Sequence, residues 1–323
     1  MYVPLLHARQ EERLAVREVA NALVAAGNVN PLYIPVRDKK GKPGVAIRQL
    51  EFAVREVSKA RLPTYVLTTP FAHKTDPVQS TILKVMEECD SHGVTIPVVA
   101  VTSGKPLATL IKEIAALKGK PFGVLHRGEA ADPDRLQVEL DKHQIATHFF
   151  FEGDCDNAYC DRWEFSNRVL LQDGFARQQR NADHRQGVDE EYSDLAYRYR
   201  RKGFEGYGDH TIVGEIFTPT GGGKAAITVA IHLTFQTLVA NRPQSIWIRH
   251  FLSDDSTATA PRAVCVRQAL DKLGRFINQH RRAFAFSTAC QYFAGPPAST
   301  PSLGVLKRRS IKHHLELMSH LNL

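Results

Sequence analysis

The stretch Ile96-Pro-Val-Val-Ala-Val-Thr102 and the residues that follow it decide the fold, because they show a strand, a helix and then the same pair again. The quoted residues are apolar and largely β-branched, as in a buried strand, and residues 106–117 have helical periodicity. Phe122-Gly-Val-Leu125 and residues 133–143 repeat this pair roughly thirty residues later, a spacing typical of successive βα units. Such an order predicts a parallel sheet with helices outside it.

The same rhythm runs through the first half of the chain. A helix is expected over residues 8–26, and further strands are expected at residues 32–36, 64–69, 146–152 and 168–172. About eight strand candidates precede the C-terminal helices, and no Gly-rich dinucleotide fingerprint follows the first of them. The sequence therefore predicts a (β/α) TIM-like barrel, and an open parallel α/β sheet is the alternative.

The rhythm changes after Gly203. Strand-like segments at residues 206–214, 226–235 and 245–251 follow one another with no room for helices between them. We therefore expect the last strands to be irregular or to carry an antiparallel addition. No domain boundary is visible, so we expect one barrel-like domain over residues 1–323, with the N-terminal helix 8–26 and a basic helical tail over 260–323.

Composition narrows the choice of partners and location. The net charge is +8 and the pI is about 9.2, with basic runs at residues 198–202 and 307–314. These runs are either ordinary solvated helix faces or contacts for phosphates, on an anionic small molecule or on nucleic acid. The chain opens Met-Tyr-Val-Pro with charged residues at 9–13, and it has no long apolar run and an odd number of cysteines. We expect a cytoplasmic protein without a membrane span or a disulfide framework.

The candidate site follows from the barrel, because the loops after the carboxyl ends of the strands build the site in that fold. The residues expected to do proton transfer at the barrel mouth are Asp173, Asp209, His232 and His250. The residues expected to bind the ligand are Arg177, Arg180, Asn181, Asp183, Tyr207 and Asp254. In these positions arginine would hold phosphate or carboxylate, and the Asp–His pairs would move the proton.

Each candidate also has a structural interpretation. The segment around Asp173 is also consistent with the start of a surface helix, Gly206-Tyr-Gly-Asp209 with a hairpin or bulge, and His232 with a core histidine. A divalent metal held by His232, His250 and nearby aspartates stays open, but no HxH or HExxH spacing supports it, so no metal ligand is assigned. Gly221-Gly-Gly-Lys224 lacks the spacing of a phosphate-binding loop and is expected to be a loop only.

Several of these segments, taken in order, resemble the phage and bacterial "beta protein" family in its myxobacterial branch. The matching segments cover roughly residues 2–275 and are Tyr2–Gln10, Leu171–Phe175, Arg180–Asp183, Gly206–Asp209, Ala230–Phe235 and Arg249–Asp254. The chain departs from the pattern at His210, where an aromatic residue is common. The resemblance implies a barrel-type α/β protein from a phage-related or antiviral-defence context, with a nuclease-like protein as a partner.

Two functions follow as hypotheses. In the first, a pocket at the barrel mouth binds an anionic, phosphate- or nucleotide-like ligand, and whether the protein is an enzyme stays open. In the second, the chain is a non-catalytic component of a defence complex that contacts nucleic acid or a nuclease through its basic runs.

Overall fold

The chain forms two compact units whose segments alternate along the sequence. The computed structural model describes residues 1–35, 43–69, 78–215, 228–239, 242–254, 261–295 and 299–321. Unit 1 contains Met1–Arg13, Ala20–Gln172 and Arg198–Asp209, and unit 2 contains Leu14–Val19, Asp173–Tyr197 and His210–Leu323. Where the sequence predicts one domain over residues 1–323, the contacts within the chain separate these two units.

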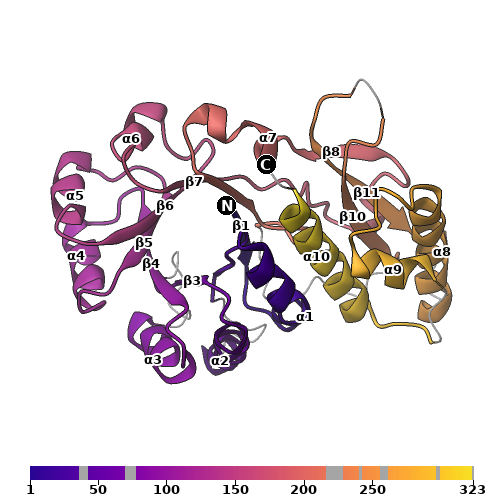
Figure 1. Cartoon of the computed structure of the whole chain (residues 1–323), viewed down its shortest axis with the longest axis horizontal. Helices are drawn as coiled ribbons and strands as arrows, with labels where there is room; N and C mark the ends of the chain where they lie inside the picture. The colour runs from indigo at the N-terminus through magenta and orange to yellow at the C-terminus, as the bar shows by residue number, and fades with distance from the viewer. Residues whose placement is uncertain are drawn as a thin grey trace. The chain divides into compact units, whose positions relative to one another are not determined.

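Unit 1 is a closed parallel barrel of eight strands, which confirms the predicted fold (Figure 1). Its strands, in spatial order, are β1 (Tyr2–Leu6), β2 (Leu32–Tyr33), β3 (Thr64–Leu67), β4 (Thr95–Thr102), β5 (Phe122–Arg127), β6 (Ile145–Phe151), β7 (Arg168–Leu171) and β9 (Gly206–Asp209). The barrel closes because β9 pairs in parallel with both β7 and β1.

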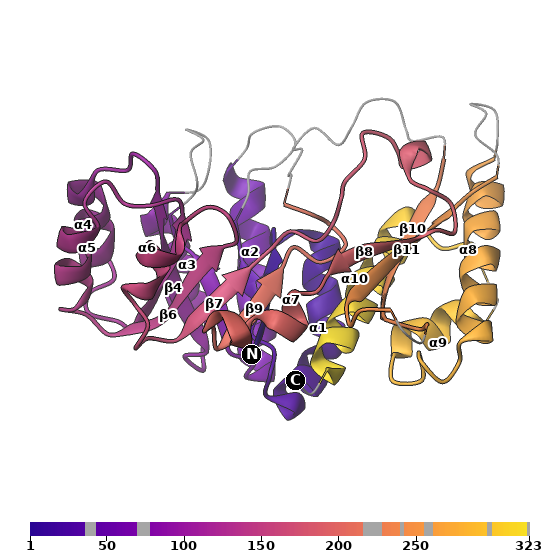
Figure 2. The ribbon, with the colours of Figure 1, turned by 90° about the horizontal axis from the view of Figure 1, so that it is seen from above.

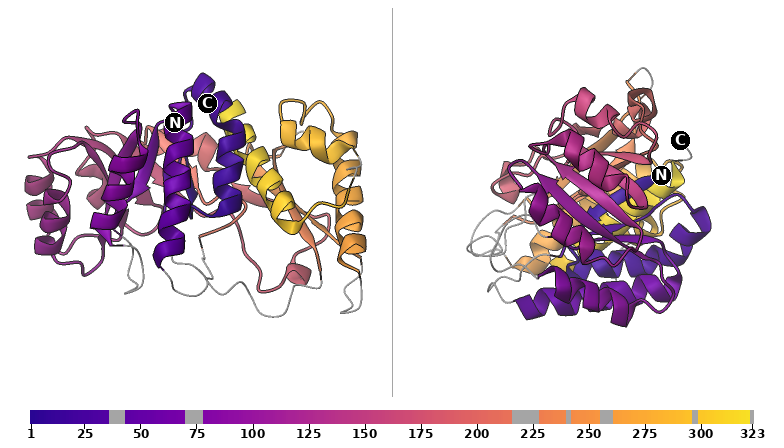
Figure 3. Two further views of the ribbon diagram at one scale, coloured as in Figure 1. Left: turned by 90° about the horizontal axis from the view of Figure 1, so that it is seen from below. Right: turned by 90° about the vertical axis from the view of Figure 1, so that its left-hand side faces the viewer.

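Helices connect successive strands of unit 1 and lie outside the barrel, as Figures 2 and 3 show for α3 to α6. The helices are α1 (Gln10–Ala26), whose middle part Leu14–Val19 belongs to unit 2, α2 (Pro43–Ala60), α3 (Gln79–Cys89), α4 (Leu107–Ala115), α5 (Pro133–Leu140) and α6 (Asn157–Asp161). Helix α1 ends where Gly27 adopts φ 67°, a left-handed conformation that glycine accepts without strain, and the Gly27 N–H donates to Leu23 O.

Alternate residues of each strand point into the barrel and fill it. The interior contains Leu5, Leu67, Ala100, Phe149 and Leu171, all buried, together with other apolar side chains from the same strands. The interior is therefore a packed core, and polar groups of unit 1 gather at the strand ends or outside the barrel.

The two glycines of Gly206-Tyr-Gly-Asp209 serve closure of the barrel. A Cβ on Gly208 would lie 2.1 Å from the carbonyl oxygen of Val3, and one on Gly206 would lie 2.9 Å from that of Met1. Only glycine lets β9 approach β1 this closely. The glycines thus need no ligand to explain them.

Outside β5 and β6, unit 1 buries two histidines in an aromatic cluster. His126 Nε2 lies 3.0 Å from His148 Nδ1, and His126 Nδ1 lies 3.0 Å from the Tyr159 hydroxyl. The His126 ring stacks on Phe150 at 4.4 Å between centroids, and Trp163 contacts both imidazoles. Burial lowers the pKa of His126 well below its usual value and that of His148 to about 3.

Unit 2 is built on a separate antiparallel sheet with the strand order β10-β11-β8. Its elements are β8 (Asp189–Ser193), β10 (Ala230–Gln236), β11 (Ile246–Leu252), α8 (Arg262–Gln279), α9 (Thr288–Ala294) and α10 (Leu303–His320), with a 3₁₀ turn at Asn181–Asp183. Two short elements, α7 (Leu195–Arg198) and a 3₁₀ turn at Arg200–Lys202, precede β9. The predicted antiparallel addition is therefore present, and it is a sheet of its own.

The two faces of this sheet differ in character. One face is apolar and packs on α8, with Ile231, Leu233 and Phe251 against Leu273 and Phe276. The other face carries His232, Thr234 and His250, since these residues alternate with the apolar ones along β10 and β11. The period of two thus separates an ordinary core from a polar face within one sheet.

Helix α10 contacts the edge strand β10 at Thr234. His313 Nε2 lies 2.7 Å from the carbonyl oxygen of Thr234, and His314 Nδ1 lies 2.9 Å from the Thr234 hydroxyl. An open strand edge exposes unpaired backbone groups, so these contacts stabilise the end of the sheet. Both histidines of the basic run 307–314 named here are therefore buried structural groups.

Three further predictions concern the whole chain. No helix among the described residues is long and apolar enough to cross a membrane. All five cysteines are free. The predicted loop at Gly221–Lys224 lies outside the described residues.

Candidate metal centre in unit 2

Two of the predicted site residues meet across the polar face of the unit 2 sheet. His232 on β10 and His250 on β11 are direct cross-strand partners in the antiparallel register. Residues opposite each other in this way point to the same face with their side chains in contact. Their Nδ1 atoms lie 2.7 Å apart, so one imidazole donates a hydrogen bond to the other.

A third histidine, His184, reaches the same place from the loop before β8. The 3₁₀ turn at 181–183 ends at His184, and the next residues are bonded to β11. Gln186 forms a β-bridge with His250, the Gly187 N–H donates to the His250 carbonyl at 3.0 Å, and the Gln186 side chain accepts from the Leu252 N–H. These bonds fix the loop so that His184 lies beside the pair.

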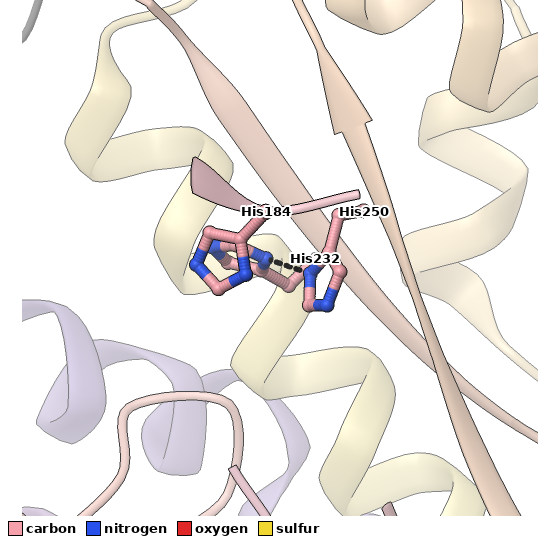
Figure 4. Close-up of side chains that lie close together, drawn as sticks. All are labelled: His184, His232 and His250. Carbon is pink, nitrogen blue, oxygen red and sulfur yellow. Dashed lines mark hydrogen bonds between the residues drawn. The ribbon is translucent and has the colours of Figure 1, made fainter. Parts of the chain in front are cut away.

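The three imidazoles form a compact group (Figure 4). The ring centroids are 4.2 Å apart for His184 and His250, and 4.9 Å apart for each ring and His232. One nitrogen from each ring can be chosen so that all three atoms lie within 4.8 Å of one another. His184 and His250 are buried, and His232 is partly buried.

Hydrogen bonding does not satisfy all of these nitrogens. His184 is only 7% exposed, yet its Nδ1 is buried with no hydrogen-bond partner among the described residues. Buried polar atoms are nearly always paired, because an unpaired one costs about 1–3 kcal/mol. An orphaned nitrogen on an imidazole that lies beside two other imidazoles is the arrangement expected of a site for a bound group.

Burial favours the neutral form of all three rings. Burial is the main cause that lowers the pKa of each ring, to about 4 for His250 and well below the usual value for His232. The charges of the neighbouring histidines lower the pKa of His232 and His250 further. Neutral imidazole is the form that binds a metal ion.

Two other side chains border the histidine group. Phe175 presents its ring to the group, with its centroid 5.0 Å from that of His232. Glu190 on β8 places a carboxylate oxygen 3.6 Å from His250 Nε2. One side of the centre is thus apolar and another carries a negative charge.

The donor set fits a divalent transition metal. Imidazole nitrogen suits zinc, copper, nickel or iron, and a zinc–nitrogen bond is about 2.0–2.1 Å long. Nitrogens around a tetrahedral zinc would be about 3.3 Å apart, so the rings would need to move by roughly 1 Å or less to bind it. Within the described ranges no fourth His, Cys, Asp or Glu joins the group.

Other predicted residues of unit 2 have structural partners instead. Asp173 Oδ1 accepts from the Phe175 N–H and Oδ2 from the Glu215 N–H, so this carboxylate organises its loop. Arg180 and Asp183 pair with each other on the surface, at 2.8 Å. The hypothesis that Asp173 transfers protons and that Arg180 binds an anion therefore gains no support from their geometry.

The remaining unit 2 candidates are peripheral. Asn181 donates to the Thr228 carbonyl at 2.9 Å, and Asp254 pairs with Lys272 at 2.6 Å. Arg177 lies on the exposed loop between β7 and the 3₁₀ turn. None of the three belongs to the histidine group.

Tyr207 and Asp209 belong to unit 1. Asp209 is buried and accepts a hydrogen bond of 2.8 Å from the Tyr2 hydroxyl, and the Tyr207 ring packs against Tyr2 and Tyr199. Their register with Tyr2 and Pro4 places them on the side of β9 that faces away from the packed interior. Asp209 lies on the barrel strand β9, whereas His232 and His250 lie on the separate sheet of unit 2, so the expectation that all three follow barrel strands is wrong.

Sequence reasoning missed His184 and Glu190. His184 directly follows the segment Arg180–Asp183 named above, but no spacing relates it to His232 or His250. The group exists because a loop is bonded to β11 and because β10 and β11 pair in one register. Only the register of β10 with β11 could have been predicted from the sequence, because the period-two patterns around His232 and His250 indicate which residues share a face.

Comparisons with known proteins identify no family for this chain. A scan against protein-family models finds no match, and a search of curated proteins finds none either. N-acetylneuraminate lyase from Mycoplasma synoviae has a similar structure, with 11% identity and a TM-score of 0.40 over 65% of this chain and 67% of the lyase. The homocysteine methyltransferase MmuM from Escherichia coli matches with 11% identity and a TM-score of 0.39 over 64% of this chain and 90% of the enzyme. Similarities at this level indicate no activity for this chain.

Proposed function

We propose that the protein is a metal-binding protein whose working centre is the group of His184, His232 and His250 in unit 2. The observation that carries the proposal is the convergence of three imidazoles from three segments, with the buried Nδ1 of His184 left without a partner among the described residues. A divalent ion of the zinc class would bond to this nitrogen and to one nitrogen of each other ring.

Three protein ligands leave a coordination position for a further group. Structural zinc sites usually have four protein ligands, whereas catalytic sites have three and bind water or substrate at the fourth position. When bound, the metal would polarise that group. An anionic ligand such as a phosphate or a carboxylate, the class that the sequence predicts, suits this position because the ion supplies the positive charge that Arg180 does not.

The alternative, contact with nucleic acid through the basic runs, is less well supported. Glu18 pairs with Arg308 at 3.3 Å, with Arg309 at 3.0 Å and with Lys312 at 3.6 Å, which neutralises part of the C-terminal run. In unit 1, Glu152 pairs with Arg198 and Lys202 in the same way. These ion pairs reduce the free positive charge that phosphate contacts would need. The phage-related context and the nuclease-like partner stay predictions.

Metal analysis of the purified protein tests the proposal. We expect about one equivalent of zinc, or tight binding of added zinc or cobalt(II), and at least about 100-fold weaker binding in His184→Ala and His232→Ala. His280→Ala is the matched control, because this histidine lies in unit 2 and packs on Phe276 away from the group. Wild-type protein that binds neither ion more tightly than the His184→Ala variant would overturn the proposal.

A further inference from the structure

Glu190 on β8 lies beside the histidine group, next to His250. Its position on β8 is paired with Ile248 of β11, so its side chain lies on the same face of the sheet as His250, two residues further along β11. The side chain of Glu190 is 17% exposed, so most of it is withdrawn from water. A largely buried carboxylate needs partners, and among the described residues Glu190 contacts His250 and Arg185.

The first partner is His250. Glu190 Oε2 lies 3.6 Å from Nε2 of His250, and Nδ1 of the same ring faces His232. An approach of about half an ångström would turn the contact into a hydrogen bond from Nε2–H to the carboxylate. A proton held on Nε2 leaves the lone pair of Nδ1 directed at the other imidazoles, which is the tautomer that a metal ligand needs.

The second partner is Arg185, the residue after His184. Arg185 Nε donates to Glu190 Oε1 at 2.9 Å, and the Arg185 side chain is otherwise exposed. The pair holds the backbone next to His184 against β8, in addition to the bonds of Gln186 to β11. Glu190 therefore contacts His250 directly, and it contacts the segment of His184 through Arg185.

We propose that Glu190 is the positioning residue of the metal centre, fixing the tautomer of His250 and the approach of His184. This inference rests on the proposed metal function. Outer carboxylates of this kind typically contribute 10–100-fold to metal affinity when they orient a histidine ligand. The role needs the negative charge as well as the shape of the side chain.

The test compares zinc affinity in Glu190→Gln with that in Glu191→Gln. Glu191 is the next residue on β8, points to the opposite face and accepts a hydrogen bond from the Ser245 hydroxyl, so it controls for loss of a carboxylate on this strand. We expect zinc affinity to fall roughly 10–100-fold in Glu190→Gln and to change less than about threefold in Glu191→Gln. Arg185→Gln should give a smaller loss, because it leaves the contact with His250.

The visible spectrum of bound cobalt(II) provides a readout that a purely structural role would not change. We expect the spectrum to differ from that of wild type in Glu190→Gln and to be restored in part in Glu190→Asp. If wild type and Glu191→Gln bind zinc and Glu190→Gln binds it equally well with an unchanged cobalt spectrum, the positioning role is wrong and the metal centre stands. If wild type and Glu191→Gln bind no metal, the proposed function itself fails.

Discussion

Two groups of buried histidines distinguish the two units of this protein. In unit 1, His126 uses both ring nitrogens, one toward His148 and one toward Tyr159, and lies in a stack of aromatic rings. In unit 2, His232 and His250 share one hydrogen bond, and the buried Nδ1 of His184 finds no partner among the described residues. Both groups are buried, and burial lowers the pKa of histidines in both.

The difference teaches that burial and a lowered pKa do not by themselves identify a site. Desolvation acts on any imidazole in a core, so both groups show it. Hydrogen bonding is the more informative property. Both ring nitrogens of His126 have a partner, whereas the buried Nδ1 of His184 has none among the described residues. A second difference is the carboxylate of Glu190, which has no counterpart in the contacts of His126.

Removing one ring from each group should give the largest effects on stability and on zinc affinity. His126→Ala removes a fully buried ring that packs on Phe150 and Trp163, so we expect a loss of about 3 kcal/mol in the free energy of unfolding of unit 1. Zinc affinity should stay at the wild-type value. His250→Ala should show the opposite pattern. It should lose most of the zinc affinity, and its free energy of unfolding without metal should fall less than that of His126→Ala.

Urea unfolding followed by fluorescence separates the two effects, because the two tryptophans lie in different units. Trp163 belongs to unit 1 and Trp247 to unit 2, so a Trp247→Phe background reports on unit 1 alone. Loss of zinc from His126→Ala, with unit 1 still folded, would contradict the division into a structural and a functional group.

Acid should weaken unit 1 through His148. Its pKa is lowered from 6.5 to about 3, so the unfolded chain binds a proton at a pH where the folded chain does not. The stability contribution of the neutral ring is therefore complete above pH 6.5 and is lost as the pH falls toward 3, by as much as a few kcal/mol. We expect His148→Gln to flatten the dependence of unit 1 stability on pH between 7 and 4, measured by urea unfolding with EDTA present. Parallel curves for variant and wild type would show that His148 does not carry this response.

The fold was predictable because its signals are local. The strand at Ile96–Thr102 and its repeat at Phe122–Leu125 are read from periods and spacing, and the barrel follows from their number. The site was only partly predictable, since His232 and His250 meet through a strand register whereas His184 arrives through bonds of its loop to β11. Long-range pairing of this kind leaves no spacing in the sequence.

The separate sheet of unit 2 explains the main error. The sequence predicts that the strand-like segments after Gly206 belong to the same barrel, either as irregular last strands or as an antiparallel addition. The short β9 at Gly206–Asp209 already closes the barrel, and its two glycines are explained by the approach of β1. The strands of His232 and His250 instead form a sheet of their own.

The smallest expected effect extends the comparison from histidines to carboxylates. Glu152 of unit 1 forms ion pairs of 2.5 Å with Arg198 and 2.6 Å with Lys202, and these partners lower its pKa from 4.5 to about 2. Its stability contribution is therefore present above pH 4.5 and is lost as the pH falls through about 2. Glu152→Gln should cost about 1–2 kcal/mol at pH 7 and progressively less in acid, with zinc affinity unchanged because the variant lies in unit 1. If the loss in free energy of unfolding stays constant down to pH 2, Glu152 stabilises unit 1 through the shape of its side chain and not through its charge. Its contribution would then come from packing, as that of the unit 1 histidines does.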